Sequence, residues 1–286
     1  MKKLMTLIMI LALIIATLAG CTKSTEVEAA SDSKADADSM ETVEQNDFEK
    51  FIERGYVVVG LDDTFAPMGF RTTDGELVGF DVEMAKAAFE KMGMEARFQP
   101  IEWSMKETEL NSGNIDMIWN GYTITDQRLE KVNFTKPYLK NRQVIVTLPE
   151  TGITTLAELE GKSVACQNES SSYDAIMKAE AFVSTLDGGT PITFETNNEA
   201  FMDLEAGRVE AVVADEILAM YYIGQKGVEN FVVFEEDLGK EEYGVGVRKS
   251  DTVFLEKLNG ALGEMKSDGT AAEISIKYFG KDIVEK

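Results

Sequence analysis

The sequence predicts an α/β protein, because short β-like runs alternate with amphipathic helical patterns from Tyr56 to the C-terminus. The first β-like run, Tyr56–Leu61, lies between Gly55 and the acidic pair at 62–63. In the next segment, 81–93, apolar residues recur at helical spacing. This alternation is typical of a largely parallel sheet covered by helices.

The later elements follow the same alternation. Ser104 and Glu107 have the spacing of a capping box, so a helix is predicted from there to Gly113. Thr270 and Glu273 repeat that spacing and predict a last helix, ending at Gly280. The remaining predicted strands are 115–119, 163–166, 209–214 and 243–248. The remaining predicted helices are 154–160, 171–186, 198–206, 216–225 and 254–266.

The N-terminal residues predict export. Lys2 and Lys3 precede an uncharged run, 4–18, which has the charged start and apolar centre of a signal peptide. A run of about 17 apolar residues can also just span a bilayer, so a transmembrane anchor is the alternative. The sequence LAGC at 18–21 resembles the lipobox of bacterial lipoproteins, whose cysteine is acylated and becomes the N-terminus. We therefore expect a lipoprotein signal peptide at 1–20 and a lipid on Cys21.

Residues 21–45 are poor in apolar side chains and rich in Ser, Ala, Asp and Glu, so we expect an acidic, disordered tether. The formal charge is −23, and it becomes −25 once the two lysines of the signal peptide are removed. This acidity argues against a nucleic-acid partner, which needs clustered Lys and Arg, and it leaves membrane attachment to the acyl chains. About 240 residues remain, enough for two domains.

The chain has no histidine, which excludes His-based acid–base catalysis and metal ligation by His. If Cys21 carries lipid, Cys166 has no cysteine partner. Its apolar neighbours, Val164 and Ala165, predict a buried free thiol. A nucleophilic role is not expected, because no histidine is present to activate the sulfur. We expect neither a cofactor nor a metal site.

Residues after the predicted strand at 115–119 suit an anionic ligand. Arg128 offers a planar fork of donors for a carboxylate, although it is equally a surface arginine in the first turn of a helix. Gly121 and Thr123 follow the carboxyl end of the strand, where open α/β sheets bind ligands. Gly121 lets the main chain approach a ligand, and Thr123 adds a hydroxyl.

Three groups of motifs resemble the polar amino-acid family of periplasmic-type binding proteins, the relatives of glutamine-, histidine- and lysine/arginine/ornithine-binding proteins. The resemblance covers essentially all of residues 48–281. The motifs are DDTFAPMGF at 62–70 with GFDVE at 79–83, DMIWNGYTITDQR at 116–128 with FTKPY at 134–138, and GKSVA at 161–165 with VVAD at 212–215 and YGVGV at 243–247.

The resemblance implies a two-lobed periplasmic-binding-protein fold with the ligand in the cleft between the lobes. Lobe 1 is expected at 46–140 plus 243–286, and lobe 2 at 146–238. Two hinge segments, near 141–146 and 238–243, would join them. Without the resemblance, two α/β halves in tandem would satisfy the same pattern.

The resemblance also implies roles for individual residues. Gly121, Thr123 and Arg128 would hold the ligand's carboxylate, and Asp215 would receive its α-ammonium. From the residues alone, Asp215 is as readily a helix N-cap. Ser170 and Ser171 would present a polar loop and a helix N-terminus from lobe 2. The segment 168–171 departs from the family pattern, since it lacks the glycine that relatives usually have there.

Four further residues complete the predicted ligand site. By resemblance, Phe65 and Trp103 would be aromatic walls around the ligand's side chain, although lone aromatics are more often core. Asp62 would touch a polar or cationic tail, such as that of arginine, lysine, histidine or glutamine. If Asp62 is merely solvated, the pocket would take a small or sulfur-containing amino acid. Asn120 is expected to face the cleft.

Taken together, these features predict a monomeric, lipid-anchored extracytoplasmic binding protein that passes an amino acid to the permease of an ABC importer. An enzyme on the same scaffold is the alternative. It would be a dehydratase of the cyclohexadienyl or arogenate type, with Glu102 or Glu169 as acid or base. A receptor sensor domain or a cell-wall hydrolase would need additional domains.

The lipid anchor is directly testable by replacing the acylated residue. Cys21→Ser should leave the protein soluble and shed from the cell, because no sulfur remains to carry the acyl chains. Fractionation of cells and medium, followed by immunoblotting, measures the distribution. Retention of this variant in the membrane fraction would contradict the lipoprotein prediction.

Overall fold

The computed structural model describes residues 46–286, so the predicted signal peptide, Cys21 and the whole of the predicted tether lie outside the described residues. Within this part of the chain, no helix combines the length and the apolar character needed to cross a membrane. Helices and strands alternate as expected, which confirms the α/β class.

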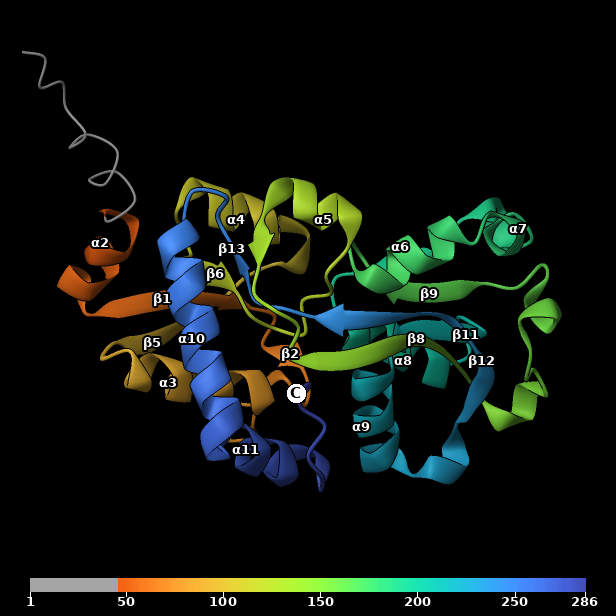
Figure 1. The fold of residues 1–286 in the computed structure, drawn as a ribbon. Helices are drawn as coiled ribbons and strands as arrows, with labels where there is room; N and C mark the ends of the chain where they lie inside the picture. The colour runs from red at the N-terminus through yellow and green to blue at the C-terminus, as the bar shows by residue number, and fades with distance from the viewer. Residues whose placement is uncertain (1–45) are drawn as a thin grey trace, which may run out of the picture. The chain divides into compact units, whose positions relative to one another are not determined.

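Two five-stranded sheets organise the fold (Figure 1). In the first sheet, the strands β5 (Glu95–Pro100), β1 (Tyr56–Leu61), β6 (Met117–Ile118) and β7 (Asn133–Phe134) run parallel, and β13 (Gly246–Val247), between β6 and β7, is antiparallel to both. In the second, β10 (Ile192–Phe194), β9 (Val164–Gln167) and β11 (Ala211–Asp215) are parallel, β8 (Leu139–Thr147) is antiparallel to β11, and β12 (Val232–Tyr243) is antiparallel to β8. We call each sheet with its helices a lobe.

The chain crosses between the sheets twice. It leaves the first lobe through β8 and returns through β12, and these two strands pair from Leu139–Tyr243 to Thr147–Val232. The end of β12 also joins the first lobe, because Thr123 forms a β-bridge with Tyr243. The two crossings therefore match the predicted two-lobed fold with two hinge segments, and they exclude two independent halves in tandem.

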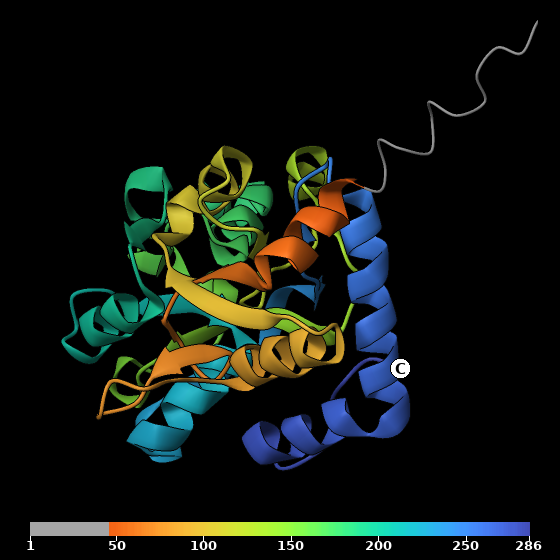
Figure 2. The ribbon, with the colours of Figure 1, turned by 90° about the vertical axis from the view of Figure 1, so that its left-hand side faces the viewer.

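Helices cover each sheet. The first lobe carries α2 (Asn46–Arg54), α3 (Phe80–Lys91), α4 (Lys106–Ser112), α5 (Asp126–Lys131), α10 (Thr252–Asp268) and α11 (Thr270–Phe279). In Figure 2, α10 and α11, in blue, lie beside the orange helices α2 and α3. The second lobe carries α6 (Ser171–Lys178), α7 (Glu180–Val183), α8 (Asn197–Glu205) and α9 (Glu216–Lys226). A small hairpin sheet, β2 (Thr64–Phe65), β3 (Gly69–Arg71) and β4 (Leu77–Val78), adjoins the first lobe.

Both capping boxes predicted from sequence spacing are wrong. Helix α4 begins after Met105 and has no side-chain cap, since the Glu107 carboxylate instead accepts a hydrogen bond from Tyr122 Oη at 2.8 Å. Helix α11 begins after Gly269, and the Thr270 hydroxyl donates to Asp268 at 2.7 Å. In each case a competing partner for one member of the box overrides the local pattern.

Several element boundaries also differ from the prediction. The helix predicted at 171–186 is divided into α6 and α7, and that at 154–160 is a 3₁₀ turn, Leu156–Leu159. Strand β12 extends far before the predicted strand at 243–248. Cys166 is fully buried in β9 and forms no disulfide, as predicted, and burial raises the pKa of its thiol to about 12.

A buried charge cluster joins the first lobe's sheet to its helices. Asp116, which is 4 % exposed, accepts from Val58 N at 2.7 Å and pairs with Arg54. Its second oxygen lies 3.3 Å from Arg248 Nη2. Asp116 thus connects α2, β1 and the segment after β13, and its removal leaves Arg248 with less compensation inside the protein.

Asp116→Ala should lower the free energy of unfolding by about 3 kcal/mol, because it leaves Val58 N without its acceptor and removes a carboxylate partner from both Arg54 and Arg248. Glu95→Ala is the control, since its ion pair with Arg97 is exposed and should contribute less than about 1 kcal/mol. Urea denaturation followed by circular dichroism measures both. Equal losses of unfolding free energy in the two variants would show that Asp116 contributes no more to stability than an exposed ion pair does.

Candidate functional site

The predicted site residues follow the carboxyl ends of strands from both lobes. Asp62 follows β1, Asn120 and Gly121 follow β6, Ser170 follows β9, and Asp215 ends β11. Every predicted ligand-binding residue other than Gly121 is less than 8 % exposed, including Phe65, Trp103, Thr123, Arg128 and Ser171. The fold therefore gathers polar and charged groups out of solvent where open α/β sheets place ligands.

Arg128 is a buried cation with an unused donor. It lies in α5, which Thr125 caps, and its side chain is held by Nη1 donating to Thr123 O at 3.0 Å. Its guanidinium carbon lies 4.7 Å from the centre of the Tyr122 ring. Among the described residues, Nη2 is buried without a hydrogen-bond partner. The surface-arginine interpretation is thus wrong, and an anion would satisfy the free donor.

Gly121 has a backbone that a side chain would disrupt. Its φ is +56°, and a Cβ there would lie 2.9 Å from Phe65 Cε1. Its N–H donates to the buried Asp81 carboxylate at 2.7 Å, and Tyr138 Oη donates to the same oxygen at 2.9 Å. Burial raises the pKa of Asp81 to about 7. Asp81, from the GFDVE motif, therefore positions the loop that carries Gly121.

Asp215 is not a side-chain cap of α9. Its carboxylate instead accepts from Tyr243 Oη and, at 2.8 Å, from Gln143 Nε2. Burial raises the pKa of Asp215, while these two hydrogen bonds act to lower it. The N-cap interpretation is therefore wrong, and the carboxylate faces the hinge strands β8 and β12.

A second, partly buried carboxylate lies beside Asp215 and was missed from the sequence. Glu241 Oε1 accepts from Gln143 Nε2 at 2.8 Å and from Asn141 Nδ2 at 2.6 Å. Burial, then repulsion from Asp215, raise the pKa of Glu241 to about 7. The available signal was polar residues at 141 and 143 immediately before the apolar run 144–146, inside a predicted hinge.

The two lobes meet through polar side chains. Thr123 Oγ1 donates to Ser171 Oγ at 3.1 Å, and Ser170 caps α6 by accepting from Tyr173 N at 3.2 Å. Gln167 Nε2 donates to Asp62 Oδ2 at 2.8 Å. Separating the lobes would break the Thr123–Ser171 and Gln167–Asp62 contacts together.

Asp62 is already engaged in this structure. Its Oδ1 accepts from Thr64 N and Oγ1 at 2.8 and 2.6 Å, and its backbone N–H donates to Asn120 Oδ1 at 3.0 Å. Burial raises the pKa of its carboxyl group. Gln167, which reaches Asp62 from the second lobe, also accepts from Asn197 Nδ2 at 3.0 Å. Asp62 is therefore neither a solvated carboxylate nor a free one.

The two predicted aromatic walls lie in different surroundings. Phe65 packs against Gly121, whereas Trp103 meets Tyr122 edge-on with ring centres 5.7 Å apart. Both belong to clusters of buried apolar residues. Asn120 Nδ2, by contrast, is buried without a partner among the described residues, so it retains a donor near Asp62.

A buried lysine spans the lobes at the loop that lacks the family's glycine. Lys106 Nζ donates to Trp103 O at 3.1 Å and, across the cleft, to Glu169 O at 2.9 Å. Burial and the nearby Arg128 cation lower the pKa of Lys106 to about 8. Glu169 has a φ of +53°, the left-handed region that glycine adopts most easily.

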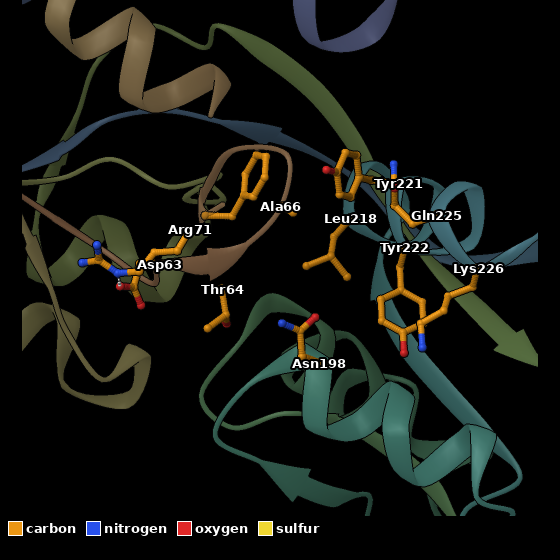
Figure 3. A pocket seen from close by; sticks show the side chains of 11 residues that line it. Asp63, Thr64, Ala66, Arg71, Asn198, Leu218, Tyr221, Tyr222, Gln225 and Lys226 are labelled. Atoms are coloured by element: carbon orange, nitrogen blue, oxygen red, sulfur yellow. Dashed lines mark hydrogen bonds and ion pairs between the residues drawn. The ribbon is translucent and has the colours of Figure 1, made fainter. Parts of the chain in front are cut away.

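A pocket of about 380 Å³ lies beside the buried cluster of predicted site residues (Figure 3). It shares no lining residue with the predicted site, although its Asp63 and Thr64 directly follow Asp62. The other lining residues come from the β2–β3 hairpin and from α8 and α9: Ala66, Phe70, Arg71, Asn198, Leu218, Tyr221, Tyr222, Gln225 and Lys226. The pocket is thus an indentation between the lobes, outside the buried charges.

Comparison with known proteins agrees with the motifs. Residues 57–281 match the model of the bacterial extracellular solute-binding proteins, family 3. The L-cystine-binding protein TcyJ of Escherichia coli is 32% identical over 82% of this chain and 87% of its own. An ABC uptake transporter substrate-binding protein from Streptococcus pneumoniae, solved with bound histidine, is 40% identical with a TM-score of 0.82, over 84% of this chain and 99% of its own. The ancestral amino-acid-binding protein AncCDT-1, a precursor of cyclohexadienyl dehydratase, is 31% identical with a TM-score of 0.74. This similarity covers 81% of this chain and 98% of that protein's own.

Glu169→Gly should raise the free energy of unfolding by up to about 1 kcal/mol, because glycine adopts a positive φ without the Cβ clash. Glu160→Gly is the control at an exposed position with φ −57°, where glycine should cost about 0.5–1 kcal/mol. Urea denaturation compares them. A Glu169→Gly protein less stable than wild type would show that the loop is not strained by the glutamate.

Proposed function

This chain belongs to family 3 of the bacterial extracellular solute-binding proteins, and we propose that it captures an amino acid outside the cell and delivers it to an ABC importer. The export signal and lipobox support attachment to the outer face of the cell membrane through lipid on Cys21. Its partners would then be a free amino acid and a membrane permease, with the protein acting as a monomer.

The observation that carries this proposal is the pair of complementary, unsatisfied charges in the buried cluster. Arg128 Nη2 has no partner among the described residues, and neither Asp215 nor Glu241 forms an ion pair with a described Lys or Arg. A zwitterion offers a carboxylate to Arg128 and an ammonium to Asp215. Each charge would otherwise stay buried at a cost, so the site favours a ligand that carries both.

Ligand entry requires the lobes to separate, because every predicted contact residue is nearly inaccessible to solvent. Arg128 and Thr123 belong to the first lobe, whereas Ser171 and Asp215 belong to the second. A ligand that contacts both lobes therefore binds the closed arrangement more tightly than an open one. This differential affinity would drive closure about the hinge strands β8 and β12, and the permease would recognise the closed form.

The ligand's side chain would extend toward Asp62. Its carboxylate and the free Asn120 Nδ2 favour a polar or cationic tail, which would replace Gln167 as the partner of Asp62. Histidine, bound by the Streptococcus pneumoniae relative, has such a tail. The sulfur-containing alternative retains support, since TcyJ is named for L-cystine.

An enzyme is the second candidate, supported by the similarity to a precursor of cyclohexadienyl dehydratase. That similar protein is itself named as amino-acid-binding. The two carboxylates considered as acid or base, Glu102 and Glu169, are exposed, outside the buried cluster. Incubation with arogenate or prephenate tests this candidate, and formation of the aromatic product would establish it.

The proposed function predicts tight binding of an amino acid that depends on Arg128. A thermal-shift screen of the twenty amino acids and cystine should identify a ligand, and calorimetry should show Arg128→Ala weakening it by about 3–5 kcal/mol. Arg128→Lys should also lose affinity, since a point charge does not reproduce two parallel hydrogen bonds. Arg97→Ala, at an exposed ion pair, should bind as wild type does. Unchanged affinity in Arg128→Ala would remove the carboxylate assignment.

A further inference from the structure

Asp215, which is buried, and Glu241, which is partly buried, form a carboxylate pair held by one amide. Gln143 Nε2 donates to both, at 2.8 Å each, so the two acids are close neighbours. Ser172 Oγ donates to Gln143 Oε1 at 2.6 Å, which fixes the amide with its nitrogen toward the carboxylates. The orientation of Gln143 is therefore set by a second hydrogen bond rather than by the acids alone.

Neutral and negative groups contact Glu241 inside the protein, and on its solvent side Glu241 lines a surface depression together with Lys140 and Lys240. Strand β8 contributes the amides of Asn141 and Gln143, and β11 contributes Asp215. The Thr123 hydroxyl and the Tyr243 phenol complete the surroundings. No described lysine or arginine pairs with Glu241, and its strand neighbours Lys240 and Glu242 are exposed.

Among the described residues, Arg128 is the cation whose charge lowers the pKa of Asp215. Its free Nη2 is the donor that we assign to the ligand's carboxylate. Once that carboxylate is bound, two acids remain opposite one ligand ammonium. An amide at position 241 would still accept hydrogen bonds from Asn141 and Gln143, so the hydrogen bonds alone do not require a carboxylate there.

We propose that Glu241 is a second acidic residue at the amine end of the ligand site, where it selects for an α-ammonium and releases a proton when the ligand binds. This inference rests on the proposed function. A ligand without an amine would leave both acids uncompensated, and Glu241 thus adds to the penalty that Asp215 imposes. The proton leaves the Glu241 carboxyl for solvent, and the bound amino acid remains a zwitterion.

The direction of the pH dependence follows from the ligand-free state. With the pKa of Glu241 raised to about 7, the pair holds a proton over part of the neutral range. The ligand's ammonium favours the charged carboxylate and so lowers that pKa in the complex. Affinity should therefore increase as pH rises through 7 and level off above it, with a slope of at most about tenfold per pH unit.

Calorimetry in two buffers of different ionisation enthalpy counts the protons released. The probes are L-arginine, L-histidine and L-cystine, and the one that wild type binds most tightly is used from pH 6 to 8. Wild type should release a fraction of a proton at pH 7, and E241Q should release almost none. Glu242→Gln, a neutralisation of the exposed neighbour on the same strand, should match wild type.

Discrimination provides a second readout. The same variants are titrated at pH 8 with the desamino analogue of the chosen probe, in which hydrogen replaces the ammonium. The preference for the amino acid over this analogue should fall about tenfold in E241Q and stay unchanged in Glu242→Gln. A melting temperature for E241Q at or above that of wild type at pH 8 shows that the variant is folded, since it has lost only a repulsive charge.

The outcomes separate the two proposals. Tight binding by wild type without proton release, or the same release and preference in E241Q, would overturn the role of Glu241 and leave the proposed function standing. If wild type binds none of the three probes, this inference is overturned. The proposal of a polar or cationic ligand and its cystine alternative are then overturned as well. Proton release and amine preference that both disappear in E241Q would support it.

Discussion

The antiparallel pairing of β8 with β12 is the constraint on which the rest of the structure depends. These strands carry the chain out of the first lobe and back, so neither lobe is a continuous segment. The end of β12 also pairs with the Thr123 loop: Ile124 N donates to Glu242 O at 2.9 Å, and Gly244 N donates to Tyr122 O at 3.0 Å. The hinge strands are thereby connected directly to the candidate site.

This connection places the carboxylates of Glu241 and Asp215 at the strands about which the lobes would move. Gln143 and Glu241 lie on the two crossing strands, and Asp215 ends the strand that pairs with β8. Burial makes each charge sensitive to its neighbours, because little water remains to screen it. A ligand that compensates Arg128 and the carboxylate pair therefore acts on the segments that separate or join the lobes.

Much of the fold followed from local patterns. Alternating apolar runs predicted the α/β class. The strand predicted at 56–61 coincides with β1, and the one at 209–214 differs from β11 by only a few residues. The motifs also drew attention to Arg128 and Asp215, and both residues are buried in the structure. The capping boxes at Ser104 and Thr270 failed because tertiary partners or a neighbouring aspartate replaced the local hydrogen bonds. Strand β12 was not predicted, because its many acidic residues interrupt the alternation of apolar and polar side chains that indicates a strand.

The sequence by itself determined the fold class, the family and the types of charge available to a ligand. Periodicity and motif order are properties of residues that are close together in the chain, so they can be recognised without the tertiary structure. Only the tertiary structure decided which charges meet. Glu241 and Gln143 are almost a hundred positions apart. Their contact depends on the register of β8 against β12, which is set by packing across the whole sheet. A second register, that of β8 against β11, places Gln143 beside Asp215, and no local pattern contains that information.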